Sequence, residues 1–243
     1  IFLANSGLRS LMRTIQEKSA PLRLVSQNVN HDIQDYTAAA AEGSIKGVYS
    51  PINTFYLLSF PTSSIMYCFD TRSVLENGAA RASTWNAINA KAFCNTKDGI
   101  VYFGKAGYVG KYTGFTDNAA TYRMSYYTTW IDFDPAIRIS ILKKSIMTVI
   151  GTGDQVITMK WAYDYSTNYF SENVTIDSLG SPAEYNVGEY GIGEYGPDLT
   201  VNIVNTSGSS SGKVLQYGVE SVINGAQVSI QRIDLYAKTG RLQ

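Results

Sequence analysis

Two strand-length runs near the C-terminus constrain the fold of this chain more than any other feature. They cover residues 213–223 and 226–238 and are joined by Asn224-Gly225. Asn-Gly suits a type I′ turn because both residues tolerate positive φ, so the sequence predicts a β-hairpin here. In the second run the apolar alternation slips by one residue between Ile230 and Ile233. Such a slip predicts a β-bulge, in which one extra residue enters the ladder.

Further runs of the same kind predict an all-β fold. The shorter ones lie in the first half of the chain and the longer ones in the second half: 55–60, 65–69, 92–95 and 100–105, then 138–150, 156–165 and 199–205. In the run 156–165 the large apolar side chains share one face: Ile157, Met159, Trp161, Tyr163 and Tyr165. One apolar face and one polar face indicate an antiparallel sandwich or barrel.

The lengths of the predicted strands and the spacing of the turns between them predict two domains. Residues 1–118 alternate short strands with turns such as Asp98-Gly99, which is typical of propeller-like blades, and we expect this region to continue from a missing N-terminal part. Residues 1–3 match residues 101–103 at an offset of 100 residues, about two long blades. Residues 119–243 form the antiparallel β domain, with a linker at 114–120. A helix is predicted at 33–42, capped by Asp32 and ended by Gly43.

Composition argues against several functional classes. The chain has 18 Tyr against 9 Phe, 16% charged residues, and 20 basic residues balanced by 20 acidic ones. Zero net charge is not typical of a protein that grips nucleic acid by bulk charge, so any DNA contact would be local or loose. We expect no membrane span and no metal or disulfide framework, with Cys68 and Cys94 as buried thiols in a reducing cytoplasm.

No catalytic or cofactor site is predicted. His31 is the only histidine and is interpreted as a structural or solvated residue. Residues 191–196 satisfy GxGxxG, but Pro197 and a further strand follow where a phosphate-binding helix should begin. Residues 208–213 resemble a Walker loop one residue too short and are interpreted as a flexible hairpin loop. The expected cofactors are therefore none.

Two charged clusters leave alternatives open. Glu189 and Glu194 lie in a repeated Gly-Glu-Tyr sequence and could serve as a glycosidase carboxylate pair, although we favour a loop that packs on a neighbouring subunit. Arg138, Lys143 and Lys144 form the one basic cluster. Alternation places Lys143 on the opposite face from the other two, which favours a solvated sheet face over a channel wall that touches DNA.

The order of several motifs resembles one known family. These are residues 126–133 (YYTTWIDF), 138–144 (RISILKK), 161–165 (WAYDY), 214–218 (VLQYG) and 233–238 (IDLYAK), with a weaker match at 7–11 (GLRSL). In this order they resemble the tail hub or nozzle proteins of short-tailed bacteriophages, also called packaged-DNA stabilisation proteins. The resemblance covers roughly the second half of the chain.

The resemblance implies a structural virion protein with no enzymatic activity. It implies a ring of six identical copies below the portal and adaptor that closes the DNA channel, carries fibres, spikes or a needle, and conducts double-stranded DNA without sequence specificity. Localisation would be the virion tail, after assembly in the host cytoplasm. Two alternatives come from other classes: a carbohydrate-binding or glycoside-cleaving β-propeller protein, and a bacterial surface adhesin.

Overall fold

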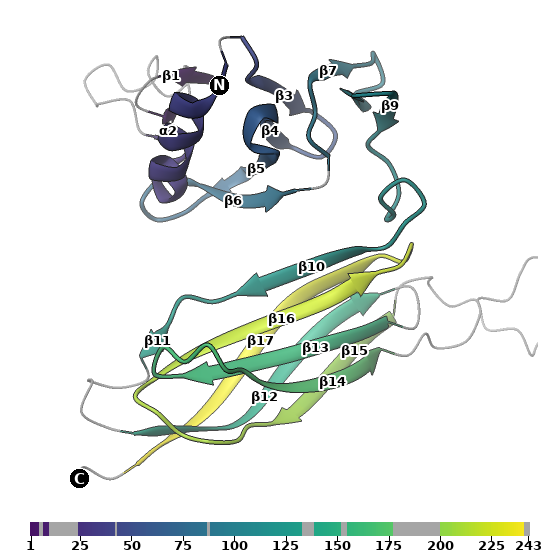
Figure 1. Cartoon of the computed structure of the whole chain (residues 1–243). Coiled ribbons are helices and arrows are strands. Elements are labelled where there is room, and N and C mark those ends of the chain that lie inside the picture. The colour runs from purple at the N-terminus through teal and green to yellow at the C-terminus, as the bar shows by residue number, and fades with distance from the viewer. Residues whose placement is uncertain are drawn as a thin grey trace, which may run out of the picture. The chain divides into compact units, whose positions relative to one another are not determined.

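The described part of the chain is almost purely β, with 60% of its residues in strands and one short α-helix. The computed structural model describes residues 1–4, 7–9, 24–41, 43–86, 88–132, 139–151, 155–176 and 200–240. It divides into two compact units, Ile1–Thr113 and Gly114–Gln243 (Figure 1). The predicted all-β fold is confirmed. The division falls five residues before the predicted boundary at 118, at the start of the tract 114–120.

The first unit is built around a four-stranded antiparallel meander. Its strands follow one another in chain order: β3 (Lys46–Ser50), β4 (Phe55–Phe60), β5 (Ile65–Val74) and β6 (Ala80–Trp85). A four-stranded meander is the shape of a propeller blade. The strand predicted at 55–60 coincides with β4, and that predicted at 65–69 is the first half of β5.

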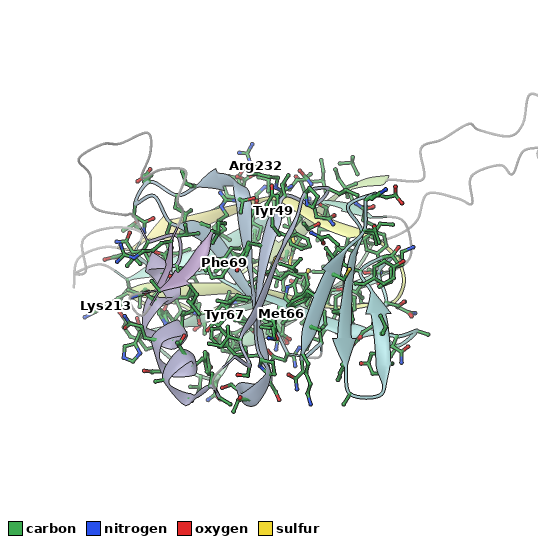
Figure 2. The ribbon with its side chains drawn as sticks, turned by 90° about the horizontal axis from the view of Figure 1, so that it is seen from above. Tyr49, Met66, Tyr67, Phe69, Lys213 and Arg232 are labelled. Atoms are coloured by element: carbon green, nitrogen blue, oxygen red, sulfur yellow. The ribbon has the colours of Figure 1, made fainter. Side chains whose placement is uncertain are left out.

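The two central strands of this sheet, β4 and β5, are buried on both faces. Leu58, Phe60, Tyr67 and Phe69 face one core, while Phe55, Leu57, Met66 and Cys68 face another. Figure 2 shows Tyr67 and Phe69 on the side of the sheet where the helix lies and Met66 on the opposite side. Alternate residues of one strand therefore anchor two separate cores, which is why β4 and β5 read as nearly continuous apolar runs.

Smaller elements cover the two faces. A hairpin of β1 (Phe2–Ala4) and β2 (Gly7–Arg9), a 3-10 turn η1 (Gln27–Val29) and α2 (Asn30–Ala39) lie on one side, with η2 (Pro61–Ser63) following β4. On the other side β7 (Ala92–Asn95), β8 (Val101–Lys105) and β9 (Tyr108–Lys111) form a three-stranded antiparallel sheet. Gly99 turns between β7 and β8 with φ +74°, as the Asp98-Gly99 pair predicted.

The helix differs from its prediction at both ends. It begins at Asn30 rather than residue 33, so Asp32 lies inside the first turn, where its charge suits the helix dipole, and makes no N-cap hydrogen bond. Ala40 is already extended, and Gly43 lies beyond the helix end. The alanine run therefore ends the helix midway, because only Ile33 is buried and no further apolar face holds a last turn against the sheet.

The second unit is a two-layer antiparallel sandwich (Figure 1). One sheet has the order β10 (Tyr122–Tyr127), β16 (Val214–Ile223), β13 (Gln155–Tyr163), β14 (Phe170–Ile176), with β11 (Ile131–Asp132) also paired to β16. The other has the order β15 (Thr200–Ser207), β12 (Ser140–Gly151), β17 (Val228–Thr239). Neither sheet closes into a barrel within the residues described.

A single core lies between the two layers. Ile157, Met159, Trp161 and Tyr163 of β13 meet residues of β12, β15, β16 and β17 there, as their alternation predicted. Tyr165 is an exception, because the strand ends at Tyr163 and the Tyr165 side chain is 69% exposed. The phase predicted for the strand is thus correct, and only its length was overestimated.

The C-terminal hairpin prediction is wrong in its pairing. Both strands exist, but β16 lies in the five-stranded sheet and β17 in the three-stranded sheet. β16 is already paired on both sides, by β10 and β13, so no edge remains for β17. Gly225 has φ +77°, whereas Asn224 is not among the residues with positive φ. A type I′ turn needs positive φ at both central residues, so Asn224-Gly225 does not form one. The connection crosses from one sheet to the other instead of closing a hairpin.

The predicted bulge is confirmed against a different partner. β17 pairs with β12, and Thr148 lies opposite Arg232 while Val149 lies opposite Ile230, leaving Gln231 as the extra residue. A second irregularity leaves Lys143 unopposed in β12. A slip in the apolar alternation shows that its own strand holds an extra residue, whichever strand it pairs with. The bulge could therefore be predicted correctly although the pairing of β16 with β17 was not.

Candidate functional surfaces

The outer face of the five-stranded sheet carries a carboxylate held by three donors. Glu220 of β16 accepts hydrogen bonds from Lys160 Nζ at 2.8 Å, from Arg123 Nη2 at 2.6 Å and from the hydroxyl of Tyr127. Its side chain is only 12% exposed. These residues come from three adjacent strands, β13, β16 and β10, so the cluster ties the middle of the sheet together across its outer face.

The balance of charges in this cluster rules out an acid–base role near neutral pH. Burial alone would raise the pKa of Glu220, but the hydrogen bonds from Lys160, Tyr127 and Arg123 outweigh it and hold the pKa at about 2. Burial, followed by the bond to Glu220, raises the pKa of Tyr127 to about 12. A carboxylate this acidic stays ionised and a phenol this weak stays protonated, so neither exchanges a proton at the pH of a cell.

Two aromatic pairs link the β13–β14 connection to the end of β10 and to the segment between β10 and β11. Tyr127 and Tyr169 meet edge to face with ring centroids 5.4 Å apart, and the Tyr169 hydroxyl donates to Gln216 Oε1. Trp130 and Tyr165 lie 4.8 Å apart with their planes tilted by 47°. The second pair differs from the first because Tyr165 is largely exposed to solvent.

Tyr165 lies in an uncommon backbone conformation. Asp164 and Tyr165 have φ of +51° and +60°, and the amide of Ser166 donates to the carbonyl of Tyr163 at 2.9 Å. Together these describe a type I′ turn with Tyr at a position that normally favours Gly. Asp164 stabilises the turn, because its Oδ1 accepts from the amides of Lys213 and Val214 at 2.8 and 3.2 Å. The turn thus presents one aromatic ring to solvent on a strained backbone.

Part of the outer face of the three-stranded sheet is apolar, where β15 pairs with β12, while the β17 side of the same face carries Arg232 and Asp234. Val201 and Ile203 of β15 are 61% and 66% exposed, and they lie opposite Ile150 and Thr148 of the central strand β12. Ile146 continues the row on β12. We call these five residues the β15 face. Among the described strands β15 is also the last of its sheet, so within these residues the face adjoins an unpaired strand edge.

His31, Cys68 and Cys94, the described candidates from the sequence, lie on three different elements: α2, β5 and β7. His31 is on the first turn of α2, 88% exposed, with its Nδ1 3.0 Å from Asp35 Oδ2, which agrees with a solvated residue. Cys68 is buried as predicted, and burial raises its pKa to about 12, so it is no nucleophile. Cys94 contradicts the prediction of a buried thiol, because it lies on the outward face of β7.

Residues 208–213 do not form a flexible hairpin loop. They connect β15 and β16, which belong to different sheets. The amide of Gly208 donates to Lys143 O at 3.0 Å, and Gly212 and Ser140 exchange backbone hydrogen bonds at 3.1 and 2.8 Å. Trp161 Nε1 donates to Ser209 O at 3.1 Å. The small residues are there because the loop lies directly on β12 and β13, which the sequence pattern could not reveal.

The other predicted clusters are only partly described. Glu189, Glu194 and the sequence 191–196 lie outside the described residues, as does Arg138. Lys143 and Lys144 are both exposed, because the irregularity at Lys143 turns successive residues outward. Lys144 Nζ lies 4.9 Å from the ring centroid of Tyr236. The simple alternation that predicted opposite faces for the two lysines therefore does not hold here.

The packing of the 208–213 loop predicts the effect of a substitution at Gly208. A Cβ on Gly208 would overlap the carbonyl oxygen of Leu142, which is backbone and cannot rotate away. We expect Gly208→Ala to lower the free energy of unfolding by about 1–3 kcal/mol. Gly225→Val should be similar, because Val disfavours φ +77°. Gly151→Ala meets only ordinary van der Waals contacts and is the control. Equal denaturant midpoints for Gly208→Ala and Gly151→Ala would contradict this.

No group of metal-ligating side chains occurs in the described parts of the chain. None of the described helices has the length and apolar character needed to cross a bilayer.

No family model and no curated protein matches the sequence. Among solved structures, a glycoside hydrolase family 43 arabinoxylan arabinofuranohydrolase from Bacillus subtilis, in complex with cellotetraose, is similar at 9% identity with a TM-score of 0.25. The similarity covers 76% of this chain and 39% of that one.

Proposed function

We propose that this protein is a structural subunit of a phage tail hub or nozzle. Copies of the chain, six by the family resemblance, would form a ring that closes the portal channel, retains packaged double-stranded DNA and conducts it during ejection. Its partners would be further copies, the portal and adaptor, and fibre, spike or needle proteins, and its location the virion tail. It acts through shape and assembly, and it is not an enzyme.

The β15 face is the observation that carries the proposal. Val201 and Ile203 are exposed side by side, with Ile146 and Ile150 next to them on the same sheet surface. Apolar sheet surfaces beside an open strand edge promote association with other chains, and proteins that stay monomeric protect them with Lys, Pro or a covering segment. The described β15 has neither Lys nor Pro. A subunit that packs against neighbouring copies has a use for such a surface.

The charged groups of the second unit favour a structural role as well. Glu220 is neutralised by Lys160 and Arg123, and Asp234 by Arg232 at 2.8 Å. Paired in this way, these particular charges are less available to bind a charged substrate. This supports assembly over chemistry as the role of these surfaces.

The proposal predicts an assembly that depends on the β15 face. We expect native mass spectrometry of the wild type to give a closed oligomer and Val201→Lys with Ile203→Lys to give monomers, because two charges would be buried at each contact. The melting temperature of the monomer should change little, since both side chains are exposed. Val156→Lys with Val222→Lys is the control, because these valines are 48% and 56% exposed on the other sheet.

Two outcomes would contradict the proposal. A wild type that stays monomeric at the concentrations of phage assembly would remove the basis for a ring. The other outcome is that Val201→Lys with Ile203→Lys leaves the oligomer intact while Val156→Lys with Val222→Lys dissociates it. The contact between copies would then lie on the five-stranded sheet and not on the β15 face.

The Trp130–Tyr165 pair favours a second candidate function, binding of a glycan. An exposed aromatic ring can stack on a sugar, and here it is kept at a turn position where Gly would cost less strain. Tyr165→Gly removes the ring and the strain together, so stability should change by less than about 1 kcal/mol. Wild-type binding to host-surface polysaccharide, measured by tryptophan fluorescence and absent in this variant, would support it. Equal binding by both proteins would exclude the pair as a glycan site.

A further inference from the structure

The zero net charge of the chain conceals a division between its two units. Residues 1–113 contain 11 Lys and Arg against 7 Asp and Glu, while residues 114–243 contain 9 against 13. The first unit therefore carries +4 and the second −4, and the totals of 20 basic and 20 acidic residues cancel. The zero net charge of the whole chain therefore describes neither unit, and the first unit carries enough positive charge for a local contact with DNA.

Within the first unit, the β7–β9 sheet holds much of the positive charge. The segment 91–111 contains Lys91, Lys97, Lys105 and Lys111 with Asp98 as its one acidic residue. Lys91 precedes β7, Lys97 lies in the turn to β8, Lys105 ends β8 and Lys111 ends β9. At strand spacings of about 4.8 Å and a rise of about 3.3 Å per residue, all four lie on a sheet roughly 15 Å long.

Three of these lysines are available to a partner. Lys91, Lys97 and Lys111 are exposed, and no ion pair among the described residues includes them. In contrast, Arg72, Arg123, Lys160 and Arg232 all lie against carboxylates. Lys105 Nζ lies 5.6 Å from the ring centroid of Tyr108, whose side chain is 43% exposed. The sheet thus offers ammonium groups together with an accessible phenol, both of which donate hydrogen bonds to phosphate oxygens.

We propose that the β7–β9 sheet is the surface through which each copy contacts the phosphate backbone of double-stranded DNA, independently of sequence. This inference rests on the proposed function and names the part of the chain that meets the DNA. Lysine is depleted at protein–protein interfaces, whereas its compact charge suits phosphate, so the residue type favours nucleic acid over an acidic protein. About three ammonium groups per copy make a contact that restrains DNA weakly and releases it readily.

The experiment measures binding of the full chain to fluorescently labelled duplexes of two unrelated sequences at several salt concentrations. With about three phosphates neutralised per copy, the affinity should fall about 40-fold between about 50 and about 200 mM NaCl, a log–log slope of about −2.7, equally for both sequences. Lys91→Gln, Lys97→Gln and Lys111→Gln together should reduce the slope to near zero. Lys143→Gln, Lys213→Gln and Lys238→Gln remove the same charge from the second unit and should leave the slope unchanged.

Each other outcome overturns the inference in a defined way. Absence of wild-type binding at about 50 mM NaCl, where a contact of this kind is strongest, excludes a DNA surface. Equal slopes for the two triple variants place the contact elsewhere. Tighter binding of polyglutamate than of DNA assigns the sheet to an acidic protein. Masses recorded on the same samples separate the proposals: a ring that does not bind DNA refutes only this inference, and DNA binding by a protein that forms no ring refutes the proposed function.

Discussion

Trp161→Ala is expected to lower the free energy of unfolding of the second unit by about 3–5 kcal/mol, the range for deleting a buried aromatic side chain. Trp161 is 4% exposed in the core between the two sheets. Its ring stacks on Phe170 with centroids 6.0 Å apart, and its indole nitrogen donates to Ser209 O. The substitution therefore opens a cavity and also leaves the 208–213 loop without one of its anchors.

Trp130→Ala is the matched control. Trp130 lies in the same unit but is only half-buried beside Tyr165, so its loss should cost about 1 kcal/mol. The two variants are compared by denaturant unfolding monitored by circular dichroism, which does not depend on tryptophan emission. The unfolding transitions of the two units are fitted separately. Similar losses for both variants would contradict the position of Trp161 in the core.

Glu220→Gln is expected to cost up to about 3 kcal/mol at neutral pH. Its folded-state pKa of about 2 lies well below the ordinary 4.5, and each unit of difference is worth about 1.4 kcal/mol. The amide cannot balance Lys160 and Arg123, and Lys160 is only 24% exposed. Asp234→Asn is the control, because its partner Arg232 is 72% exposed and such pairs contribute about 0–1 kcal/mol.

The same cluster predicts a pH dependence. A carboxyl group whose pKa is lowered by folding stabilises the protein fully above its unfolded pKa of about 4.5 and loses that effect as the pH falls through about 2. The difference in unfolding free energy between wild type and Glu220→Gln should therefore be constant at neutral pH and shrink from about pH 4.5 downward. A difference that persists at about pH 2 would show that the variant is destabilised by something other than charge.

Strand positions could be predicted from this sequence because alternation is a local property. β4 and β7 coincide with their predicted ranges, and the one-residue slip after Ile230 located the bulge at Gln231. Strand pairing could not be predicted in the same way. The Asn224-Gly225 turn connects neighbouring strands in sequence, but whether they pair depends on the edges of β16, which β10 and β13 occupy. That competition involves residues about a hundred positions away.

The candidate surfaces were hidden from sequence reasoning for a related reason. Glu220 gave no signal by itself, since the lysine, arginine and tyrosine that hold it come from β13 and β10. Val201 and Ile203 lie in the predicted run 199–205, whose sequence does not show that both side chains are exposed or that β15 is the last of the described strands in its sheet. The charge division between the units could have been found by counting each half separately, because it needs only the boundary between them.

The crossing of the C-terminal strands between layers also dictates when the second unit can fold. The central strand β12 cannot complete its pairing until β17, which ends at Thr239, has been synthesised. In the same way, β10 cannot pair until β16 has been synthesised. A ribosome therefore releases almost the whole unit before either sheet can be completed, and such distant pairings fold slowly. During synthesis the apolar residues of β12 remain uncovered, so the yield of native protein should depend on temperature and on chaperones more strongly than the stability of the finished fold would suggest.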